Sequence, residues 1–323
     1  MTVTMAAALN GALRDAMRDD DSIVVYGEDV GRLGGVFRIT DGLQAEFGSE
    51  RCFDTPVAES GIVGTAVGMA LYGLRPVVEM QFDGFSYPAL DQVISHVAKY
   101  RNRTRGRVGL SMVIRIPYGG GIGAVEHHSE SPEAYYVHTA GLTVVSPGNP
   151  SDAYSLLRAA VEHPDPVVFL EPKRRYWMKQ DVDLPVKGEP IGRAVVRRAG
   201  TTATLIAYGP MVVTALEAAD AAVEDGWDLE VIDVRTLSPL DVDTLTSSVT
   251  KTGRAVVVHE APAFAGYGAE IASMLNERAF GHLAAPVLRV TGFDLPYPPA
   301  KLERHYLPSS DRILDAVARA LEY

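Results

Sequence analysis

The chain has 323 residues, of which 47% are hydrophobic and 22% are charged. This ordinary globular composition excludes a disordered or fibrous protein, and the length predicts two domains. The formal net charge of −11 makes nucleic acid and anionic membrane surfaces poor partners, although residues 173–175 form a candidate local basic patch.

The first half of the chain alternates between helix and strand patterns. Periodic apolar residues predict helices, including an apolar one over residues 60–71 whose glycines suggest close approach of another backbone. Short apolar runs between the helices predict buried strands. The other helices are expected at residues 5–18, 88–100 and 151–162, and the strands at 22–26, 75–80, 111–116, 143–146 and 167–170.

A polar stretch with two prolines, residues 180–190, interrupts this alternation and predicts a linker. Beyond it, strands are expected at residues 203–207, 228–234, 255–259 and 286–290, and helices at 211–224, 242–250, 267–280 and 310–321. Strands that are apolar on both faces and alternate with helices favour parallel sheets covered by helices. The sequence therefore predicts an α/β fold in two domains.

Cys52 is the only cysteine, so an internal disulfide is impossible and a reducing compartment fits. Residues 1–21 have no basic stretch followed by an apolar run, as a signal peptide would. We therefore expect a cytoplasmic protein without a membrane span.

The glycine-rich residues 119–124 match the loose dinucleotide pattern GxGxxG/A after a predicted strand. Polar residues 126–128 follow where that pattern needs a helix, which disfavours a nicotinamide site. The nearby glutamates and histidines lack the HExxH spacing, which disfavours a metal site. Polar groups after a flexible loop suit acid–base chemistry, so we expect a mobile loop with an active-site histidine.

Two glutamates lie beside predicted elements. Glu59 stands where a loop becomes an apolar helix, and spacing alone favours a carboxylate that complements the helix dipole. A partly buried carboxylate that holds a proton against a cofactor nitrogen is the functional alternative. Glu28 follows the first strand, at the sheet edge where α/β proteins build sites, and a solvated acidic turn is its alternative.

Segments along nearly the whole chain resemble, in order and spacing, the beta subunit of the thiamine-diphosphate-dependent 2-oxoacid dehydrogenases, in their decarboxylase component. The matching segments are YGEDVGRLGGVFRIT, DTPVAESGIVGTAVGMALYGLRPVVEMQF, PALDQVISHVAKYR, HSESPEAYYVHTAGLTVVSPGNPSDA, DPVVFLEPK, EVIDVRTLSPLDVDTL and KTGRAVVVHEAP. The resemblance implies a transketolase-like fold, with a pyrimidine-binding domain over residues 1–185, a linker over 186–194 and a transketolase C-terminal domain over 195–323.

The resemblance also implies site residues. Glu59 would bond the ring nitrogen of the cofactor's aminopyrimidine, Phe85 would pack against that ring, and Gln81 is assigned to the cofactor site with them. His128 would orient the substrate and assist proton transfer during handover to the lipoyl group. Glu28 would lie near the subunit interface and link two cofactor sites.

The implied assembly has two alpha and two beta chains, with thiamine diphosphate between an alpha and a beta. The GDG motif that holds diphosphate and Mg²⁺ is missing, because the nearest string, residues 224–227, lacks the first glycine. We therefore expect the alpha subunit to carry the Mg²⁺ site and the beta chain alone to be inactive. The C-terminal domain is expected to dock the peripheral subunit-binding domain of the acyltransferase core, whose lipoyl domain is acylated.

The family's beta chain often carries a structural K⁺ bound by backbone carbonyls. The matching positions are Met112, Ala160, Val161, His163 and Asp165. His163 stands where aspartate is common and Asp165 where asparagine is common, which departs from the family pattern.

Three segments, GGVFR, HSESPEA and FLEPK, resemble the branched-chain 2-oxoacid members more than the pyruvate members. A pyruvate or acetoin enzyme is the alternative, because one or two methylenes change discrimination by only about 1–3 kcal/mol. A non-catalytic assembly subunit is a second alternative, against which the presence of both Glu59 and His128 argues.

Overall fold

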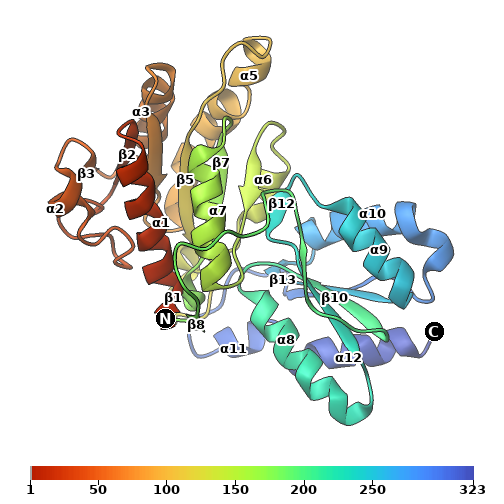
Figure 1. Cartoon of the computed structure of the whole chain (residues 1–323). Helices are drawn as coiled ribbons and strands as arrows, with labels where there is room; N and C mark the ends of the chain where they lie inside the picture. Colours follow the sequence, from red (N-terminus) through yellow and green to blue (C-terminus); the bar gives the residue numbers. More distant parts are fainter. Residues whose placement is uncertain (1) are drawn as a thin grey trace.

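A seven-stranded sheet forms the centre of the first half in the computed structural model, which describes residues 2–323 (Figure 1). Its strands are parallel except for the edge strand β12, which runs antiparallel to β6. The order across the sheet is β12 (Thr236–Ser238), β6 (Thr143–Val145), β7 (Val167–Pro172), β5 (Val113–Tyr118), β4 (Arg75–Glu79), β2 (Ile23–Gly27) and β3 (Cys52–Asp54).

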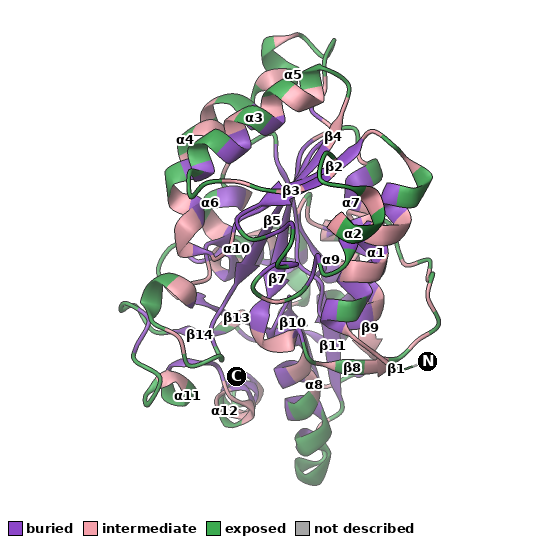
Figure 2. Cartoon of the chain, turned by 90° about the vertical axis from the view of Figure 1, so that its left-hand side faces the viewer, coloured by how far each residue is buried: buried purple, intermediate pink, exposed green. Residues whose placement is uncertain are grey.

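Alternate residues of these strands face two different helix layers, as the pleat requires. Ile23 and Val25 of β2 pack with α1 (Met5–Asp19) and α7 (Pro150–Glu162), which lie together on one face. Val24 and Tyr26 pack on the other face with α3 (Glu59–Leu71). Figure 2 shows the strands buried between these layers. The remaining elements of this half are α2 (Leu43–Phe47), η1 (Gly84–Ala89), α4 (Leu90–Gln92), η2 (Val93–Val97), α5 (Tyr100–Arg103), η3 (Glu126–His128), α6 (Glu133–Val137) and η4 (Lys173–Arg175).

The second half has a five-stranded sheet in which only β9 is antiparallel. Its order is β14 (Leu288–Gly292), β13 (Ala255–Pro262), β10 (Ala203–Ala207), β11 (Leu229–Asp233) and β9 (Val195–Arg198). Helices α8 (Met211–Ala221) and α12 (Ser310–Leu321) cover one face, and α9 (Val242–Thr252) and α10 (Tyr267–Ala279) the other. The short elements are η5 (Ala222–Asp225), η6 (Phe280–His282) and α11 (Glu303–Tyr306).

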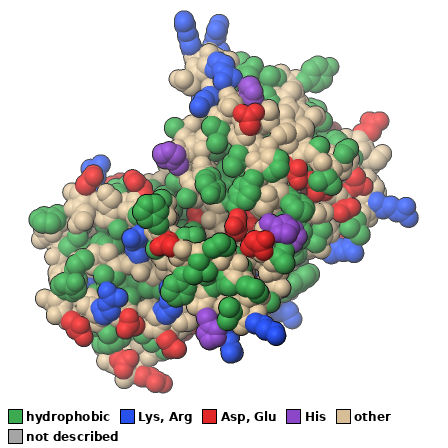
Figure 3. All heavy atoms as spheres, turned by 180° about the vertical axis from the view of Figure 1, so that it is seen from behind, with side chains coloured by type: hydrophobic (Ala, Val, Ile, Leu, Met, Phe, Trp, Pro, Cys, Tyr) green, Lys and Arg blue, Asp and Glu red, His purple; other side chains and the backbone are tan. Residues whose placement is uncertain are grey.

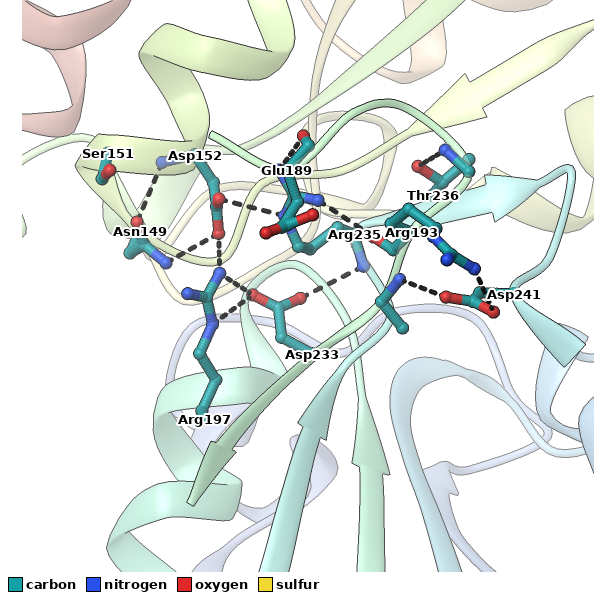
Figure 4. Close-up of polar contacts among 12 residues, drawn as sticks. Asn149, Ser151, Asp152, Glu189, Arg193, Arg197, Asp233, Arg235, Thr236 and Asp241 are labelled. Carbon is teal, nitrogen blue, oxygen red and sulfur yellow. Dashed lines mark hydrogen bonds and ion pairs between the residues drawn. The ribbon is translucent and has the colours of Figure 1, made fainter. Parts of the chain in front are cut away.

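The two halves share one apolar cluster, which joins Ile116 and Tyr118 of β5 to Ile206 of β10 and Tyr208 beyond it. A buried polar network adds to this junction (Figure 4). Arg235 Nε donates to Asp152 Oδ1 on α7 at 3.0 Å, and Arg197 bridges Asp152 and Asp233. These contacts join the second half to the start of α7, which follows β6.

The α/β fold with parallel-rich sheets is confirmed, and two local expectations were wrong. Residues 88–100 are a chain of short helical turns, in which the Ala98 amide reaches back to the Val93 carbonyl at 2.9 Å and widens the helix. The stretch expected to start the linker at residue 180 lies inside β8 (Lys179–Asp181), which pairs with β1 (Thr2–Thr4). That partner is distant in sequence, so the local pattern carried no sign of it. No helix within residues 2–323 is long and apolar enough to cross a membrane.

Candidate active site

Two buried carboxylates, Glu28 and Glu59, lie at the carboxyl edge of the large sheet. Glu28 directly follows β2, and Glu59 is the first residue of α3, with 3% and 6% of their surfaces exposed. Burial, and then the negative charge of Glu59, raise the pKa of Glu28 to about 7. Within residues 2–323, the buried Oε1 of Glu28 has no hydrogen-bond partner. The alternative interpretation of Glu28 as part of a solvated acidic turn is therefore wrong. The two carboxylates together can hold a proton near neutral pH.

The loop after β2 is held tightly around Glu28. A Cβ on Gly27 would lie 2.5 Å from the Glu79 carbonyl oxygen, so only glycine allows the two strands to meet here. Gln81 Nε2 donates to Asp29 Oδ2 at 2.9 Å and ties the end of β4 to the residue after Glu28. Gln81 thus contacts the loop that carries Glu28, and its assignment to the cofactor site stays a prediction.

Phe85 and His128 come together on the loops that follow β4 and β5. The His128 ring stacks on Phe82 with centroids 3.9 Å and planes 18° apart, and meets Phe85 edge to face at 5.2 Å. His128 Nδ1 lies 2.9 Å from the His127 carbonyl oxygen, which can only accept a hydrogen bond. That contact places the ring proton on Nδ1 and leaves the Nε2 lone pair free to accept a proton.

A buried ion pair, Asp83–Lys173, supports the loop that carries His128. Asp83 Oδ2 accepts the Glu130 amide at 2.8 Å, and its other oxygen pairs with Lys173. Burial raises the pKa of Asp83 to about 6 although Lys173 opposes the shift, and burial lowers the pKa of Lys173. The Lys173 side chain is fully buried, so the basic patch expected at residues 173–175 was wrong.

The basic surface lies instead on the segment around α5. Five exposed cations occur there within nine residues, and Figure 3 shows Lys and Arg side chains gathered at that tip. They are Lys99, Arg101, Arg103, Arg105 and Arg107. The alternating positive residues were the signal in the sequence that could have located this patch.

A buried charged trio spans three neighbouring strands below the site. Arg115 of β5 bonds Glu79 of β4 at 2.7 Å and Glu171 of β7 at 2.6 and 3.0 Å. None of these three residues was predicted from the sequence. Their signal is a single charge within each otherwise apolar strand, which buried strands tolerate only when the charges pair.

The residues matched to K⁺ binding lie at the opposite edge of the sheet, away from the carboxylate pair. Ala160 and Val161 belong to the end of α7, and Met112 and Asp165 precede β5 and β7. Their carbonyls already accept bonds inside the protein: Val161 O from Arg75 Nη1 at 3.0 Å and Ala160 O from the His163 amide at 3.2 Å. Within residues 2–323, no three His, Cys, Asp or Glu side chains are placed to hold a metal ion.

Comparison with known families and structures gives the class of the protein. The family "Transketolase, pyrimidine binding domain" matches residues 1–178, and "Transketolase, C-terminal domain" matches residues 192–313. A solved structure titled "Split gene transketolase, inactive beta4 tetramer" superposes with a TM-score of 0.83 at 24% identity, covering 99% of this chain and 98% of that one. The fold and the two family matches thus define a transketolase-like protein.

Curated relatives narrow the class. The 3-methyl-2-oxobutanoate dehydrogenase subunit beta of Mycobacterium tuberculosis (strain ATCC 25618 / H37Rv) is 58% identical, over 99% of this chain and 92% of that protein. The pyruvate dehydrogenase E1 component subunit beta of Leifsonia xyli is 53% identical, over 100% of this chain and 96% of that protein. The 2-oxoisovalerate dehydrogenase subunit beta of Pseudomonas aeruginosa is 46% identical, over 99% of this chain and 95% of that protein. The chain belongs to the beta subunits of the thiamine-diphosphate-dependent 2-oxoacid dehydrogenases.

Proposed function

We propose that this chain provides the pyrimidine side of the active site in a branched-chain 2-oxoacid dehydrogenase. The observation that carries the proposal is the buried pair Glu28 and Glu59, in which the pKa of Glu28 is raised to about 7 and one carboxylate oxygen has no partner within residues 2–323. An unpartnered buried oxygen costs free energy unless a ligand satisfies it. A polar, nitrogen-bearing ring bound beside the pair would do so.

Thiamine diphosphate, when bound, supplies a nucleophilic carbon and an electron sink for decarboxylation. Glu59 would share a proton with the ring nitrogen of the aminopyrimidine, and its exposure of only 6% keeps competing water away. Phe85 would pack against the ring, and Gln81 would hold the Glu28 loop through Asp29. Glu28 would store or release the proton that passes through the pair and would link this site to the second one in the assembly.

His128 would act on the substrate side. Its Nδ1 proton is directed at the His127 carbonyl, so Nε2 is the atom that would accept or return a proton during transfer of the acyl group to a lipoyl domain. The contacts with Phe82 and Phe85 hold the half-buried ring in one orientation.

The substrate proposal rests on the higher identity to a 3-methyl-2-oxobutanoate dehydrogenase subunit, 58%, than to a pyruvate dehydrogenase subunit, 53%. Pyruvate or acetoin stays the second candidate. The proposed partners are an alpha subunit that carries the Mg²⁺ site, in a tetramer of two alpha and two beta chains, and the lipoyl and peripheral subunit-binding domains of an acyltransferase core. We place the pyrimidine-binding and C-terminal domains at residues 1–185 and 195–323, and the assembly in the cytoplasm.

A structural K⁺ is part of the proposal. Carbonyl oxygens are ligands of the kind that K⁺ takes, and the carbonyls of Met112, Ala160 and Val161 each keep a second lone pair beside the hydrogen bond that they accept. If K⁺ binds there, the melting temperature of the tetramer will rise in KCl relative to choline chloride at equal ionic strength. An equal melting temperature in both salts would argue against the ion.

The test of function is co-expression with the alpha subunit encoded beside this chain. Decarboxylation would be followed with an artificial electron acceptor, in thiamine diphosphate and Mg²⁺, for 3-methyl-2-oxobutanoate, 4-methyl-2-oxopentanoate and pyruvate. Preference for the branched acids supports the proposal, and preference for pyruvate moves the chain to the second candidate. A folded, cofactor-loaded tetramer without turnover would favour a non-catalytic assembly subunit.

A further inference from the structure

The glycine-rich loop between β5 and α6 carries His128. Its base is closed by the Gly119 amide, which donates to the Glu130 carbonyl oxygen at 2.8 Å, and by Asp83, which accepts the Glu130 amide. His128 lies within this closed loop, against Phe82. The position of the loop therefore sets the position of His128.

The C-terminal half holds the glycine side of this loop. Glu303 of α11 accepts the Gly121 amide at 2.8 Å and the Gly123 amide at 3.2 and 3.3 Å, and Tyr297 Oη donates to the same carboxylate at 2.7 Å. Hydrogen bonds from amides to a carboxylate are stronger than those between neutral groups. These hydrogen bonds anchor the glycine side of the loop, and the mobility expected for the loop around residues 119–131 stays a prediction.

A second carboxylate repeats the arrangement. Glu260 of β13 accepts the Gly120 amide at 2.8 Å, while Arg174 lies 3.2 Å from its other oxygen. Two carboxylates from one half of the chain thus bind three amides of a loop from the other half.

The backbone conformation of the loop allows these hydrogen bonds. A Cβ on Gly120 would lie 1.8 Å from Tyr297 Oη, so no other residue allows this approach. Gly121 and Gly123 have φ of +90° and +71°, which glycine adopts without strain and which turns both amides toward Glu303. The glycines are therefore used to fit the loop to the C-terminal half.

We propose that Glu303, oriented by Tyr297, is a positioning residue that fixes the His128 loop, so that the C-terminal half controls the step that uses His128. The effect on catalysis rests on the proposed function of His128. The hydrogen bonds by which Glu303 holds the loop do not depend on that function, and hydrogen exchange measures them separately.

The experiment compares Glu303→Ala with the unaltered alpha–beta tetramer. We expect hydrogen exchange in the peptide that spans residues 119–125 to be about tenfold faster, because the Gly123 amide loses its acceptor and the Gly121 amide keeps only Tyr297 Oη, at 3.2 Å. The kcat for lipoyl-domain acylation should fall about tenfold or more, since small displacements of a proton-transfer group are costly. KM for the 2-oxoacid and Kd for thiamine diphosphate should stay within about twofold, because Glu59 and its neighbours are untouched.

Glu303→Gln keeps one acceptor oxygen for Gly121 and Tyr297 and should recover part of the acylation rate. Glu277→Ala, at an exposed position on α10, is the matched control and should behave as the unaltered protein. Tyr297→Phe removes the hydroxyl that donates to Glu303 and also accepts the Gly121 amide at 3.2 Å, and it should shift exchange and acylation in the same direction if Glu303→Ala does not fold.

Unchanged hydrogen exchange in Glu303→Ala would show that Glu303 does not hold the loop. A second outcome is that Glu303→Ala exchanges faster and still acylates at the normal rate, while His128→Ala is impaired in acylation. That result would show that the C-terminal half does not control catalysis through the loop. If His128→Ala itself acylates normally, the proposed function of His128 fails, while the exchange result still decides whether Glu303 holds the loop.

Discussion

The imidazole of His128 lies stacked on the ring of Phe82, with centroids 3.9 Å apart, although the two residues follow different strands of the sheet. Phe82 also lies 5.6 Å from Lys173 Nζ and therefore connects the histidine to the buried ion pair below it. The carboxyl ends of neighbouring parallel strands meet at one edge, which is how these residues converge.

Replacing Phe82 by leucine should loosen His128. Such ring pairs contribute about 0.5–1.5 kcal/mol, so the acylation rate should fall by up to about tenfold. Lipoyl-domain acylation by the tetramer measures the change. Phe280→Leu, at a ring that is 76% exposed, is the control, and equal rates in both variants would show that the stacking has no role.

Glu59→Gln should abolish turnover while the fold stays intact. The amide keeps the shape of the side chain but cannot take up the proton, and such a loss typically costs about 10²–10⁴-fold in rate. Steady-state decarboxylation and circular dichroism report rate and fold. Glu50→Gln, at an exposed position, should be unaffected, and a near-native rate in Glu59→Gln would refute the role of Glu59.

Glu133→Gln should change the pH dependence of stability. Glu133 is fully buried at the junction of the halves, accepts a hydrogen bond from Tyr208 Oη at 2.7 Å, and has its pKa raised by burial to about 7. The folded state therefore binds this proton more tightly than the unfolded chain, and stability decreases as pH rises from about 4.5 to 7.

Glutamine accepts the same hydrogen bond without a charge. The variant should match the unaltered protein near pH 5 and be more stable by about 1–3 kcal/mol at pH 8. Urea unfolding at both pH values measures this difference. An equal effect of the substitution at pH 5 and pH 8 would contradict the raised pKa.

Lys173→Met should strongly destabilise the protein. It leaves the buried Asp83 carboxylate without its cation, which typically costs about 3–5 kcal/mol. The loss should be smaller at low pH, because the pKa of Asp83 is already raised to about 6 and rises further without Lys173. The double variant Asp83→Asn, Lys173→Met should recover much of the stability in urea unfolding. Equal losses in the single and double variants would mean that the charge is not the cause.

Much of the fold was predictable, because it depends on patterns within ten to twenty residues. Apolar strands such as residues 203–207 and 255–259 were found where the structure has β10 and β13. Two wrong expectations, the linker start at residue 180 and the basic patch at residues 173–175, depended on distant partners. Lys173 was read as basic surface, yet it pairs with Asp83, 90 residues earlier.

The residues of the candidate site also divide into those that local sequence predicts and those that only the folded chain brings together. Glu59 and His128 were predicted as site residues because they stand in segments that resemble a known family, and Glu28 was also singled out because it follows a strand; these roles stay predictions. Glu303 was not predicted, since a glutamate in the largely charged run of residues 301–305 looks like any solvated position. Only the folded chain brings it to Gly121, 182 residues away.

The sequence by itself determined the alternation of strands and helices, the parallel sheets and the family, because the hydrophobic pattern and local motifs are properties of neighbouring residues. The tertiary structure alone decided which charges are buried and paired. Whether a carboxylate such as Glu28 holds its proton at neutral pH depends on the loss of water and on a second charge at Glu59, and both appear only when separate segments pack together.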